Sequence, residues 1–364
     1  MKLLFVDLER EWRGGQSQAL LTLRGLRQRG HDAHLVTVEG SALATRAEAA
    51  GIPAHAVGPR ARRAEALLLL RRLLSHEQFA IVHANEPQAL TAAWLAGAHK
   101  KTALVVSRRV AYPLKQGAIS RRRYLAAHRI LAISRFVQQS VLDSGVPPDR
   151  VEVVYEGVEV PSPSTAEARL QARRRWGVSE QEALFGCVGY LLPEKGQEFL
   201  VRAFPAVHAK FPGARLLFAG DGPCRSRLEA LSREQKLKEA LLFAGFVEDI
   251  PKVYAALDAF MFPSVAEPLG TSLLAAMAWG LPVVAVASGG VPEYVDDGGT
   301  GLLVAQPDPS LFSDCMLRLL NEPELTKRLG AAARQAIQKR FTADHMVENT
   351  VRVYEEVLGE RQKV

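Results

Sequence analysis

Short apolar runs alternate along the chain with longer stretches of helical periodicity. In the first half, the apolar runs lie at residues 3–6, 33–38, 80–83, 103–107, 129–132 and 151–154. Stretches such as 16–29 and 88–96 lie between these runs and have the pattern of amphipathic helices. Because buried strands that alternate with crossover helices form parallel sheets, the first half is predicted to be an α/β domain.

The same alternation starts again after a break at residues 157–165. This segment, GVEVPSPST, holds two prolines and small polar residues, as a linker does. Apolar runs follow at 184–189, 215–219, 241–243, 259–262 and 283–286, and the tail from about 341 predicts one more amphipathic helix. We expect an N-terminal domain over residues 1–160, a C-terminal domain over 161–342, and a last helix at about 343–364 that packs back on the N-terminal domain.

The predicted fold class is α/β, with two Rossmann-like, doubly wound parallel-sheet domains that face each other across a cleft. Such sheets bind ligands beyond the carboxyl ends of their strands, so the cleft is the expected site. The longest uncharged run lies between Glu267 and Glu293. Turns at Gly280-Leu281-Pro282 and at residues 288–290 interrupt it, which favours helix, turn and buried strand over a membrane span. Any membrane contact is expected to be peripheral.

The positive charge of the chain is concentrated in its first half. The net charge is +7 overall, but residues 1–150 hold 23 Lys and Arg against 11 Asp and Glu, whereas the remainder holds 23 against 28. A basic half suits an anionic partner, such as a lipid surface or a phosphorylated substrate, and scattered solvated arginines are an equal alternative. Cys187, Cys224 and Cys315 have no paired or metal-ligand spacing, and the N-terminus has the pattern of a strand rather than a secretion signal. These features favour a reducing, cytoplasmic location.

Two turns that follow apolar runs have features of a phosphate site. Gly14 and Gly15 come just before a predicted helix, where free N–H groups favour an anion and glycine allows a close approach. An ordinary tight turn is the alternative. In the second half, a run ends at Gly189 and Lys195 follows at the start of the next helix, where it can pair with a diphosphate or simply face solvent.

The most informative segment is FMFPSVAEPLGTSLLAAMAWGLPVV, at residues 260–284. An apolar strand leads into a loop with Glu267 and Gly270, and a helix opens at Thr271-Ser272. The helix start can bind a diphosphate, and Glu267 can accept hydrogen bonds from sugar hydroxyls. The alternatives are a helix cap at Thr271 or Ser272 and a surface acid at Glu267. Residues 288–293, SGGVPE, either line the same cleft or form a plain loop.

Several motifs of other protein classes are missing from the sequence. There is no Asp-x-Asp, Walker loop, complete Gly-x-Gly-x-x-Gly or Gly-x-Ser-x-Gly, and the nine histidines have no zinc spacing. Basic residues are not interleaved with aromatic ones, which argues against nucleic-acid binding. We therefore expect no metal, no cofactor and no nucleic-acid partner.

With these segments in this order, the chain resembles the retaining family-4 glycosyltransferases of the GT-B fold. The resemblance covers most of the chain and is densest in GCVGYLLPEKGQEFLVRAF, LLFAGDGP, LLFAGFVEDIPKVYAALDAFMFPS and EPLGTSLLAAMAWGLPVVAVASGGVPEYVDDGGTGLLV. The N-terminal segments WRGGQSQALLTLRGLRQRGH, FAIVHANEP, VVSRRVAYP and RILAISRFVQQSVLDSGVPPDRVEVVYEGVE fit the family more loosely.

The resemblance implies a nucleotide diphosphate sugar donor held by the C-terminal domain and a hydroxyl acceptor held by the N-terminal one. The implied transfer keeps the anomeric configuration and needs no metal. Lys195 would pair with the diphosphate and Glu267 would hold a hydroxyl of the sugar. The implied donor-binding residues are Gly14, Gly15, Gly189, Tyr190, Lys195, Phe246, Val247, Glu267, Leu269, Gly270, Thr271 and Ser272. The implied catalytic residues are Glu267, Lys195 and Arg108, and the acceptor-side candidates are His83, Glu86 and Arg109.

Three positions depart from the family pattern. Ala275 stands where a second Glu is usual, Tyr190 where many members have Arg, and Arg108 where a His is common. Each lost hydrogen bond to a charged group would weaken donor binding by about 1–3 kcal/mol. Arg108 and Arg109 can instead bind phosphate or an anionic acceptor, with a solvated pair as the alternative.

The expected mechanism uses charge stabilisation rather than an enzyme nucleophile. Lys195 and the helix start at Thr271 would stabilise the departing diphosphate, and the acceptor would attack on the face that it vacates. A catalytically impaired nucleotide-sugar binder and a nucleotide-sugar 2-epimerase are the alternatives. The basic apolar stretch at residues 60–74 can lie on an anionic membrane at the inner face, which would favour a lipid-linked or lipopolysaccharide-type acceptor. A helix buried against its own sheet is the alternative.

Overall fold

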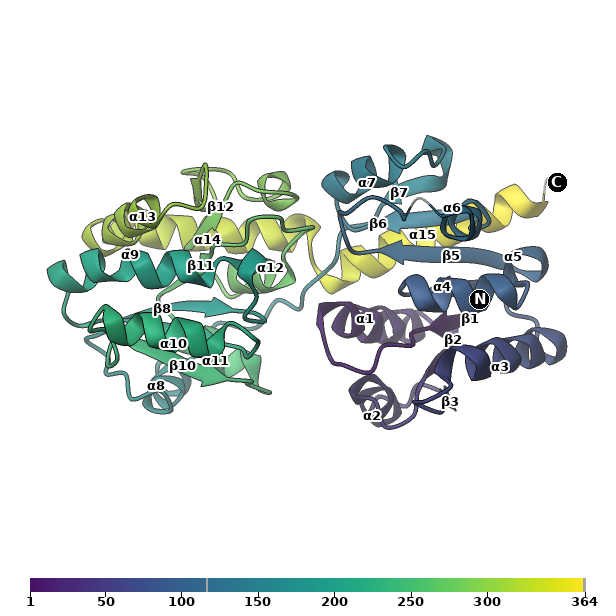
Figure 1. Cartoon of the computed structure of the whole chain (residues 1–364), viewed down its shortest axis with the longest axis horizontal. Coiled ribbons are helices and arrows are strands. Elements are labelled where there is room, and N and C mark those ends of the chain that lie inside the picture. Colours follow the sequence, from purple (N-terminus) through teal and green to yellow (C-terminus); the bar gives the residue numbers. More distant parts are fainter. Residues whose placement is uncertain (116, 363–364) are drawn as a thin grey trace. The chain divides into compact units, whose positions relative to one another are not determined.

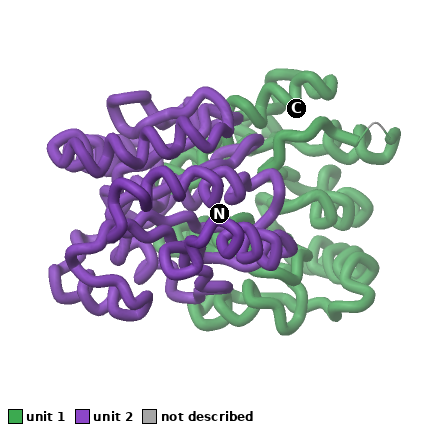
Figure 2. Tube along the Cα trace, turned by 60° about the vertical axis from the view of Figure 1, so that its left-hand side comes forward, with its two compact units in different colours: residues 1–157, 343–364 green, residues 158–342 purple. Residues whose placement is uncertain are grey.

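The computed structural model describes residues 1–115 and 117–362 of the chain. It divides into two compact units, one formed by Met1–Gly157 with Ala343–Val364 and the other by Val158–Thr342 (Figure 2). Each unit has its own parallel sheet with helices on its faces (Figure 1). The predicted fold class of two parallel α/β domains is therefore confirmed.

Unit 1 is built on a seven-stranded parallel sheet in the order β3-β2-β1-β4-β5-β6-β7. The strands are β1 Lys2–Val6, β2 Asp32–Val38, β3 Ala54–Val57, β4 Ile81–Ala84, β5 Ala103–Arg108, β6 Arg129–Ala132 and β7 Val151–Val153. The sequence pattern misses β3, because this edge strand pairs only with β2 and half of its short AHAV run is exposed. The other six strands lie within two residues of their predicted positions.

Eight helices and one 3-10 turn complete the described part of unit 1. They are α1 Gly14–Gln28, α2 Ala42–Ala49, α3 Arg62–His76, α4 Pro87–Leu95, α5 Ala98–Lys101, α6 Ala118–Leu125, α7 Arg135–Leu142, η1 Pro148–Arg150 and α15 Ala343–Gln362. Helix α15, yellow in Figure 1, packs beside α1 and buries Val347, Val353 and Tyr354 in the core of this unit.

Unit 2 has a six-stranded parallel sheet in the order β10-β9-β8-β11-β12-β13. The strands are β8 Ala183–Val188, β9 Ala214–Ala219, β10 Leu241–Gly245, β11 Ala259–Phe262, β12 Val283–Val286 and β13 Leu302–Val304. The helical elements are α8 Ala166–Arg174, η2 Pro193–Lys195, α9 Gln197–Lys210, α10 Arg225–Glu234, α11 Ile250–Ala256, α12 Thr271–Ala278, η3 Val291–Glu293, α13 Pro309–Asn321 and α14 Pro323–Arg340. The sequence pattern misses β13, a three-residue edge strand.

Helix α3 corresponds to the basic apolar stretch of the sequence. It buries Ala66, Leu70, Leu73 and Leu74 against unit 1, while Leu68 on its outer side is 64% exposed. The inner face of the helix therefore belongs to the core, as the buried-helix alternative expects. Within the described residues, no helix is both long and apolar enough to cross a bilayer.

Candidate functional site

The chemistry expected in unit 2 lies at the carboxyl edge of its sheet. Strands β8, β11 and β12 are adjacent and parallel, so the loops that follow them leave the sheet at the same edge. These loops hold Gly189 to Lys195, Ser264 to Gly270, and Ser288 to Gly290. Parallel pairing thus brings together segments that lie far apart in the sequence.

Lys195 and Glu267 form an ion pair at this edge. The Lys195 Nζ atom lies 2.7 Å from Oε2 of Glu267, and the Ser264 hydroxyl donates to the same oxygen at 2.8 Å. The Glu267 side chain is 9% exposed and that of Lys195 is 31% exposed. Since an ammonium group carries three N–H donors, the pair leaves Lys195 with hydrogen-bonding capacity for a ligand.

The SGGVPE loop fixes the backbone at Glu267. The Gly290 N–H donates to the Glu267 carbonyl at 2.9 Å, and the Ser288 hydroxyl donates to the Ser264 carbonyl at 2.8 Å. Gly289 has φ +55°, and a Cβ atom there would lie 1.9 Å from the Glu267 carbonyl oxygen. Only glycine satisfies both conditions, so this motif holds the loop that carries the carboxylate.

Lys195 lies in the 3-10 turn η2 rather than in the first turn of α9. Gly196 follows in a left-handed conformation with φ +69° and serves as the N-cap of α9. The Val265 N–H donates to the Glu194 carbonyl at 3.1 Å, which ties the Lys195 turn to the Glu267 loop. The position of the ammonium group is therefore set by backbone contacts on both sides.

Helix α12 begins at Thr271 with Gly270 as its N-cap, and no side chain caps it. The alternative in which Thr271 or Ser272 only caps the helix is therefore wrong. The first N–H groups of a helix have no partner within it and attract an anion. Tyr294 donates its hydroxyl proton to the Leu269 carbonyl at 2.6 Å and so fixes the approach to the helix.

Other predicted donor-side residues of unit 2 differ in how they are placed. Tyr190 and Phe246 are 48% and 70% exposed, and they follow the ends of β8 and β10. Val247 and Leu269 are buried in the core at 5% and 0% exposure. Their side chains are packed in the core of unit 2, so the proposed donor contact of these two residues is assigned to their backbone.

In unit 1, a polar cluster surrounds Gly15 at the carboxyl edge of the sheet. Gly14 and Gly15 are the first residues of α1 rather than part of a turn before it. The Asn85 side-chain amide donates to the Gly15 carbonyl at 3.2 Å and to the Asp7 carboxylate at 2.6 Å. Arg109 donates to the Asn85 side-chain oxygen at 2.7 Å. These contacts fix the start of α1 at the end of β4.

Arg108 and Arg109 are not a solvated pair. Arg109 forms an ion pair of 2.8 Å with the nearly buried Glu156. Arg108 is 4% exposed, and its guanidinium donates to the Tyr124 hydroxyl at 3.2 Å and to the Tyr112 carbonyl. The sequence places Arg108 after β5, whereas it is the last residue of this strand.

His83 and Glu86 have structural roles instead of acceptor contacts. The two ring nitrogens of His83 lie 2.5 Å from the Tyr354 hydroxyl and 2.7 Å from the Ser107 hydroxyl, and burial lowers its pKa to about 3. Glu86 caps α4 and accepts from the Ala89 N–H at 2.7 Å. Burial raises the pKa of Glu86 to about 7, although the N–H groups of Gln88 and Ala89 act in the opposite direction. With 3% and 9% exposure, neither side chain is open to an acceptor.

The sequence pattern singles out Ser288 as part of the SGGVPE loop, but it misses four other residues that support these groups. They share a polar side chain just beyond a strand end, and they are Asp7, Asn85, Glu156 and Ser264. Their position after a strand is the signal that could have found them. Most of their partners follow other strands, so those contacts depend on the sheet order, whereas Ser264 bonds Glu267 in its own loop.

Comparison with protein-family models gives two matches that together span most of the chain. The model of glycosyl transferases group 1 matches residues 168–336, and that of glycosyltransferase family 4 matches residues 12–160. An uncharacterised glycosyltransferase of Methanocaldococcus jannaschii is 30% identical over 246 residues, which are 65% of this chain and 63% of that protein. The D-inositol 3-phosphate glycosyltransferase of Acidothermus cellulolyticus is 34% identical over 229 residues, or 60% and 50% of the two chains. The chain spans about half to two thirds of the length of the first curated relatives that it matches.

Solved structures show the same fold over nearly the whole chain. HepE of Anabaena in complex with UDP-glucose matches with a TM-score of 0.86 at 22% identity, over 98% of this chain and 100% of that one. Sucrose-phosphate synthase of Thermosynechococcus elongatus matches with a TM-score of 0.82 at 19% identity, over 99% of both chains. The chain therefore has the GT-B fold and belongs to the group 1, family-4 glycosyltransferases, as its motifs indicated.

Proposed function

We propose that the protein transfers a sugar from a nucleotide diphosphate sugar to a hydroxyl group of an acceptor, with retention of the anomeric configuration. The observation that carries this proposal is the Lys195–Glu267 ion pair beside the uncapped start of α12. A cation and free helix N–H groups suit a diphosphate, and a carboxylate beside them suits sugar hydroxyls. The matches to glycosyltransferase family models support this assignment.

Lys195 and α12 would act on the leaving group. Negative charge grows on the diphosphate as the bond between the anomeric carbon and the phosphate oxygen breaks. Fixed positive groups that already point at this charge lower the barrier without reorganisation. In this proposal Gly270, Thr271 and Ser272 supply the helix N–H groups, and Lys195 takes the place that a divalent metal has in other phosphate sites.

Glu267 would hold the transferred sugar. Its Oε2 atom is already bonded to Lys195 and Ser264, so Oε1 remains for a sugar hydroxyl. The acceptor oxygen forms its new bond to the anomeric carbon on the face that the diphosphate leaves, and the acceptor proton passes to a phosphate oxygen. The products are the glycoside and the nucleoside diphosphate. Gly14, Gly15, Gly189, Tyr190 and the backbone at Phe246-Val247 are the further donor contacts that we propose.

The acceptor would be anionic or lipid-linked, and the protein would act in the cytoplasm at the inner face of a membrane. Relatives support this view, because two of them are named as mannosyltransferases that use GDP-mannose and act on phosphatidylinositol monomannosides. HepE is described in complex with UDP, so the similar proteins do not share one base. The basic half of the chain also suits an anionic acceptor.

The charge role of Lys195 is tested by Lys195→Ala. Loss of one preorganised donor to a developing anion lowers kcat by about 10²–10³-fold. Lys210→Ala, at the opposite end of α9 and exposed, removes the same charge far from the ion pair and is expected to keep wild-type transfer. Transfer is measured as release of nucleoside diphosphate with saturating donor, after calorimetry has shown that both variants are folded.

Wild-type transfer by Lys195→Ala would contradict the proposed role. Because Ala275 occupies the usual position of a second Glu, the same assay must also distinguish transfer from two alternatives, a nucleotide-sugar binder and a 2-epimerase. Donor binding without any turnover would favour a nucleotide-sugar binder. Release of an epimerised sugar in the absence of acceptor would favour a 2-epimerase.

A further inference from the structure

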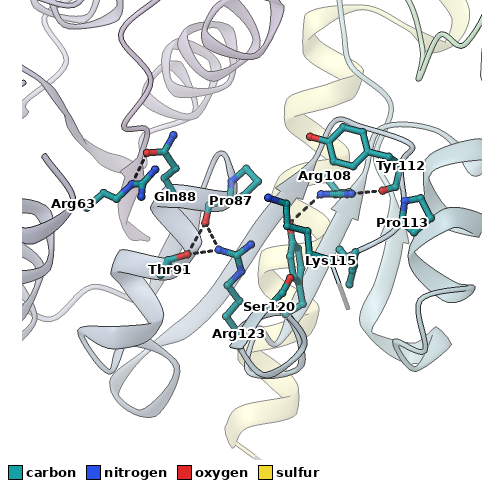
Figure 3. Close-up of a pocket in the computed structure, with 12 residues that line it drawn as sticks. Arg63, Pro87, Gln88, Thr91, Arg108, Tyr112, Pro113, Lys115, Ser120 and Arg123 are labelled. Carbon is teal, nitrogen blue, oxygen red and sulfur yellow. Dashed lines mark hydrogen bonds between the residues drawn. The ribbon is translucent and has the colours of Figure 1, made fainter. Parts of the chain in front are cut away.

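Unit 1 has a separate pocket of about 300 Å³ beside the carboxyl end of β5 (Figure 3). The start of α4, the loop after β5 and helix α6 form its walls. Its cationic lining residues are Arg63, Arg108, Lys115 and Arg123. A pocket of this size is at the small end of the range for small-molecule sites, so it can hold a compact ligand.

The positive charge of this pocket is not balanced by the protein. No acidic side chain is among its lining residues, and none of the four cations has a salt bridge to any other described residue. By contrast, the neighbouring Arg109 is paired with Glu156. A buried cation is costly without an opposite charge, and Arg108 is 4% exposed. The arrangement therefore fits an anionic ligand.

Several donors in the pocket are also unused. Among the described residues, the Nε atoms of Arg108 and Arg123 and the Ser120 hydroxyl are buried without a hydrogen-bond partner. Native proteins rarely leave buried donors unpaired, so these atoms are free to bond an acceptor such as water or a ligand. The three residues that carry them line one pocket, and they come from β5 and from successive turns of α6.

The two guanidinium groups are held in place by other contacts. Arg108 lies over the rings of Tyr112 and Tyr124, at 5.1 and 5.8 Å from their centroids. Arg123 donates to the Pro87 carbonyl at 3.0 Å and to the Thr91 hydroxyl (Figure 3). Their orientation is thus fixed before a ligand arrives, which lowers the entropy cost of binding.

We propose that this pocket binds a phosphate group that the acceptor carries. The inference rests on the proposed function, and it names the acceptor as a phosphorylated compound. A phosphate dianion has three terminal oxygens and two charges, so it can use the donors of Arg108, Ser120 and Arg123 together. Arg108 directly precedes Arg109, so the phosphate would lie next to the Gly15 cluster, with the hydroxyl-bearing part of the acceptor reaching past it.

Calorimetric titration of the full chain without donor tests this proposal. Inorganic phosphate and glycerol 3-phosphate are expected to bind, and glycerol is not. Arg123→Gln is expected to weaken binding of glycerol 3-phosphate at least tenfold. Arg122→Gln removes the same charge from the preceding position of α6, outside the pocket, and is expected to change the affinity less than twofold.

A second variant keeps the proposal testable if Arg123→Gln does not fold. Lys115→Gln changes an exposed lining residue on the loop after β5 and is expected to weaken binding three- to tenfold. Equal effects of Arg122→Gln and Arg123→Gln, or no binding of either phosphate compound, would overturn the proposal. Preference for malate over glycerol 3-phosphate would also overturn it, since it would assign the pocket to carboxylates.

Vesicles distinguish the two sources of phosphate. Stronger binding to phosphatidylinositol vesicles than to phosphatidylcholine vesicles, lost in Arg123→Gln but kept in Arg122→Gln, supports a lipid headgroup. The same pattern with glycerol 3-phosphate alone supports a soluble acceptor. These binding measurements use no donor, so they remain valid even if the protein is found not to transfer sugar. Conversely, transfer to neutral acceptors without any phosphate binding would contradict the role of this pocket but not the proposed function.

Discussion

His83 and Glu86 lie three residues apart at the carboxyl end of β4, and burial favours the neutral form of both. The pKa of His83 falls to about 3, so its contribution to stability is present above pH 6.5 and is lost as the pH falls toward 3. The pKa of Glu86 rises to about 7, so its contribution is present below pH 4.5 and is lost as the pH rises through 7. The two residues therefore give unit 1 opposite pH responses.

The Glu86 response is tested with Glu86→Gln. The variant cannot ionise but keeps an oxygen for the α4 N–H groups. Relative to this variant, the wild type is expected to lose stability between pH 5 and pH 8, by an amount on the order of 2–3 kcal/mol. Denaturant unfolding of both proteins at these two pH values measures the difference. A stability difference that stays constant over this range would contradict the raised pKa.

At the scale of elements, the loops beyond the unit 2 sheet hold one another through backbone contacts. Gly289 packs against the Glu267 carbonyl, and the turn at Glu194 accepts the Val265 N–H. The positions of the site residues therefore depend on these loops rather than on the strands. A loop movement of a fraction of an ångström would change the distance between Lys195 and Glu267.

Gly289→Ala tests whether the contact between Gly289 and the Glu267 carbonyl positions the Glu267 side chain, as distinct from the backbone strain that any residue other than glycine causes at a positive φ. The added Cβ would lie 1.9 Å from the Glu267 carbonyl oxygen, so the loop must move, and transfer is expected to fall at least tenfold. Gly298→Ala is the matched control, because Gly298 also has a positive φ, at +69°, but a Cβ there meets nothing within 4 Å. Both variants should lose about 1 kcal/mol of stability through the left-handed backbone, and Gly289→Ala should lose more because its loop must move. Equal transfer rates in the two variants would show that the contact does not position Glu267.

The sequence pattern predicts the central strands of both sheets well and misses one edge strand of each sheet. Strands β6, β11 and β12 lie at their predicted positions, because buried parallel strands are continuous apolar runs. Strands β3 and β13 are short, lie at an edge and carry a weaker apolar signal. At the site, the sequence motifs identified both Lys195 and Glu267. The burial of His83 and Glu86 could not be predicted in this way, because it depends on packing against α15 and on the position of α4. Such long-range packing leaves no local pattern in the sequence.

On the scale of the whole molecule, the basic charge and an exposed apolar residue occur on the same helix of unit 1. Residues 1–150 hold 23 basic and 11 acidic residues. Helix α3 presents Leu68 at 64% exposure, with Arg71 and Arg72 exposed in the following turn. A helix whose inner side is in the core can still place such residues on an anionic surface.

Vesicle flotation at low salt tests this surface. The wild type is expected to float with phosphatidylglycerol vesicles and not with phosphatidylcholine vesicles, and the binding should fall as salt is added. Arg71→Gln with Arg72→Gln should weaken flotation, because each basic residue near the surface contributes about 1 kcal/mol. Arg174→Gln with Arg175→Gln, which removes two exposed charges from unit 2, should not. Absence of flotation at low salt would remove the membrane proposal.

The return of α15 to unit 1 has a consequence for how the chain is made. Unit 2 is a continuous segment, so it can reach its native state as soon as Thr342 has left the ribosome. Unit 1 must wait, because the core that begins with Leu3 is closed by Val347, Val353 and Tyr354. The usual order, in which an N-terminal domain folds first during synthesis, is therefore reversed here. Nascent unit 1 therefore keeps an apolar face uncovered throughout translation of unit 2, and such a face is the kind of surface that chaperones bind.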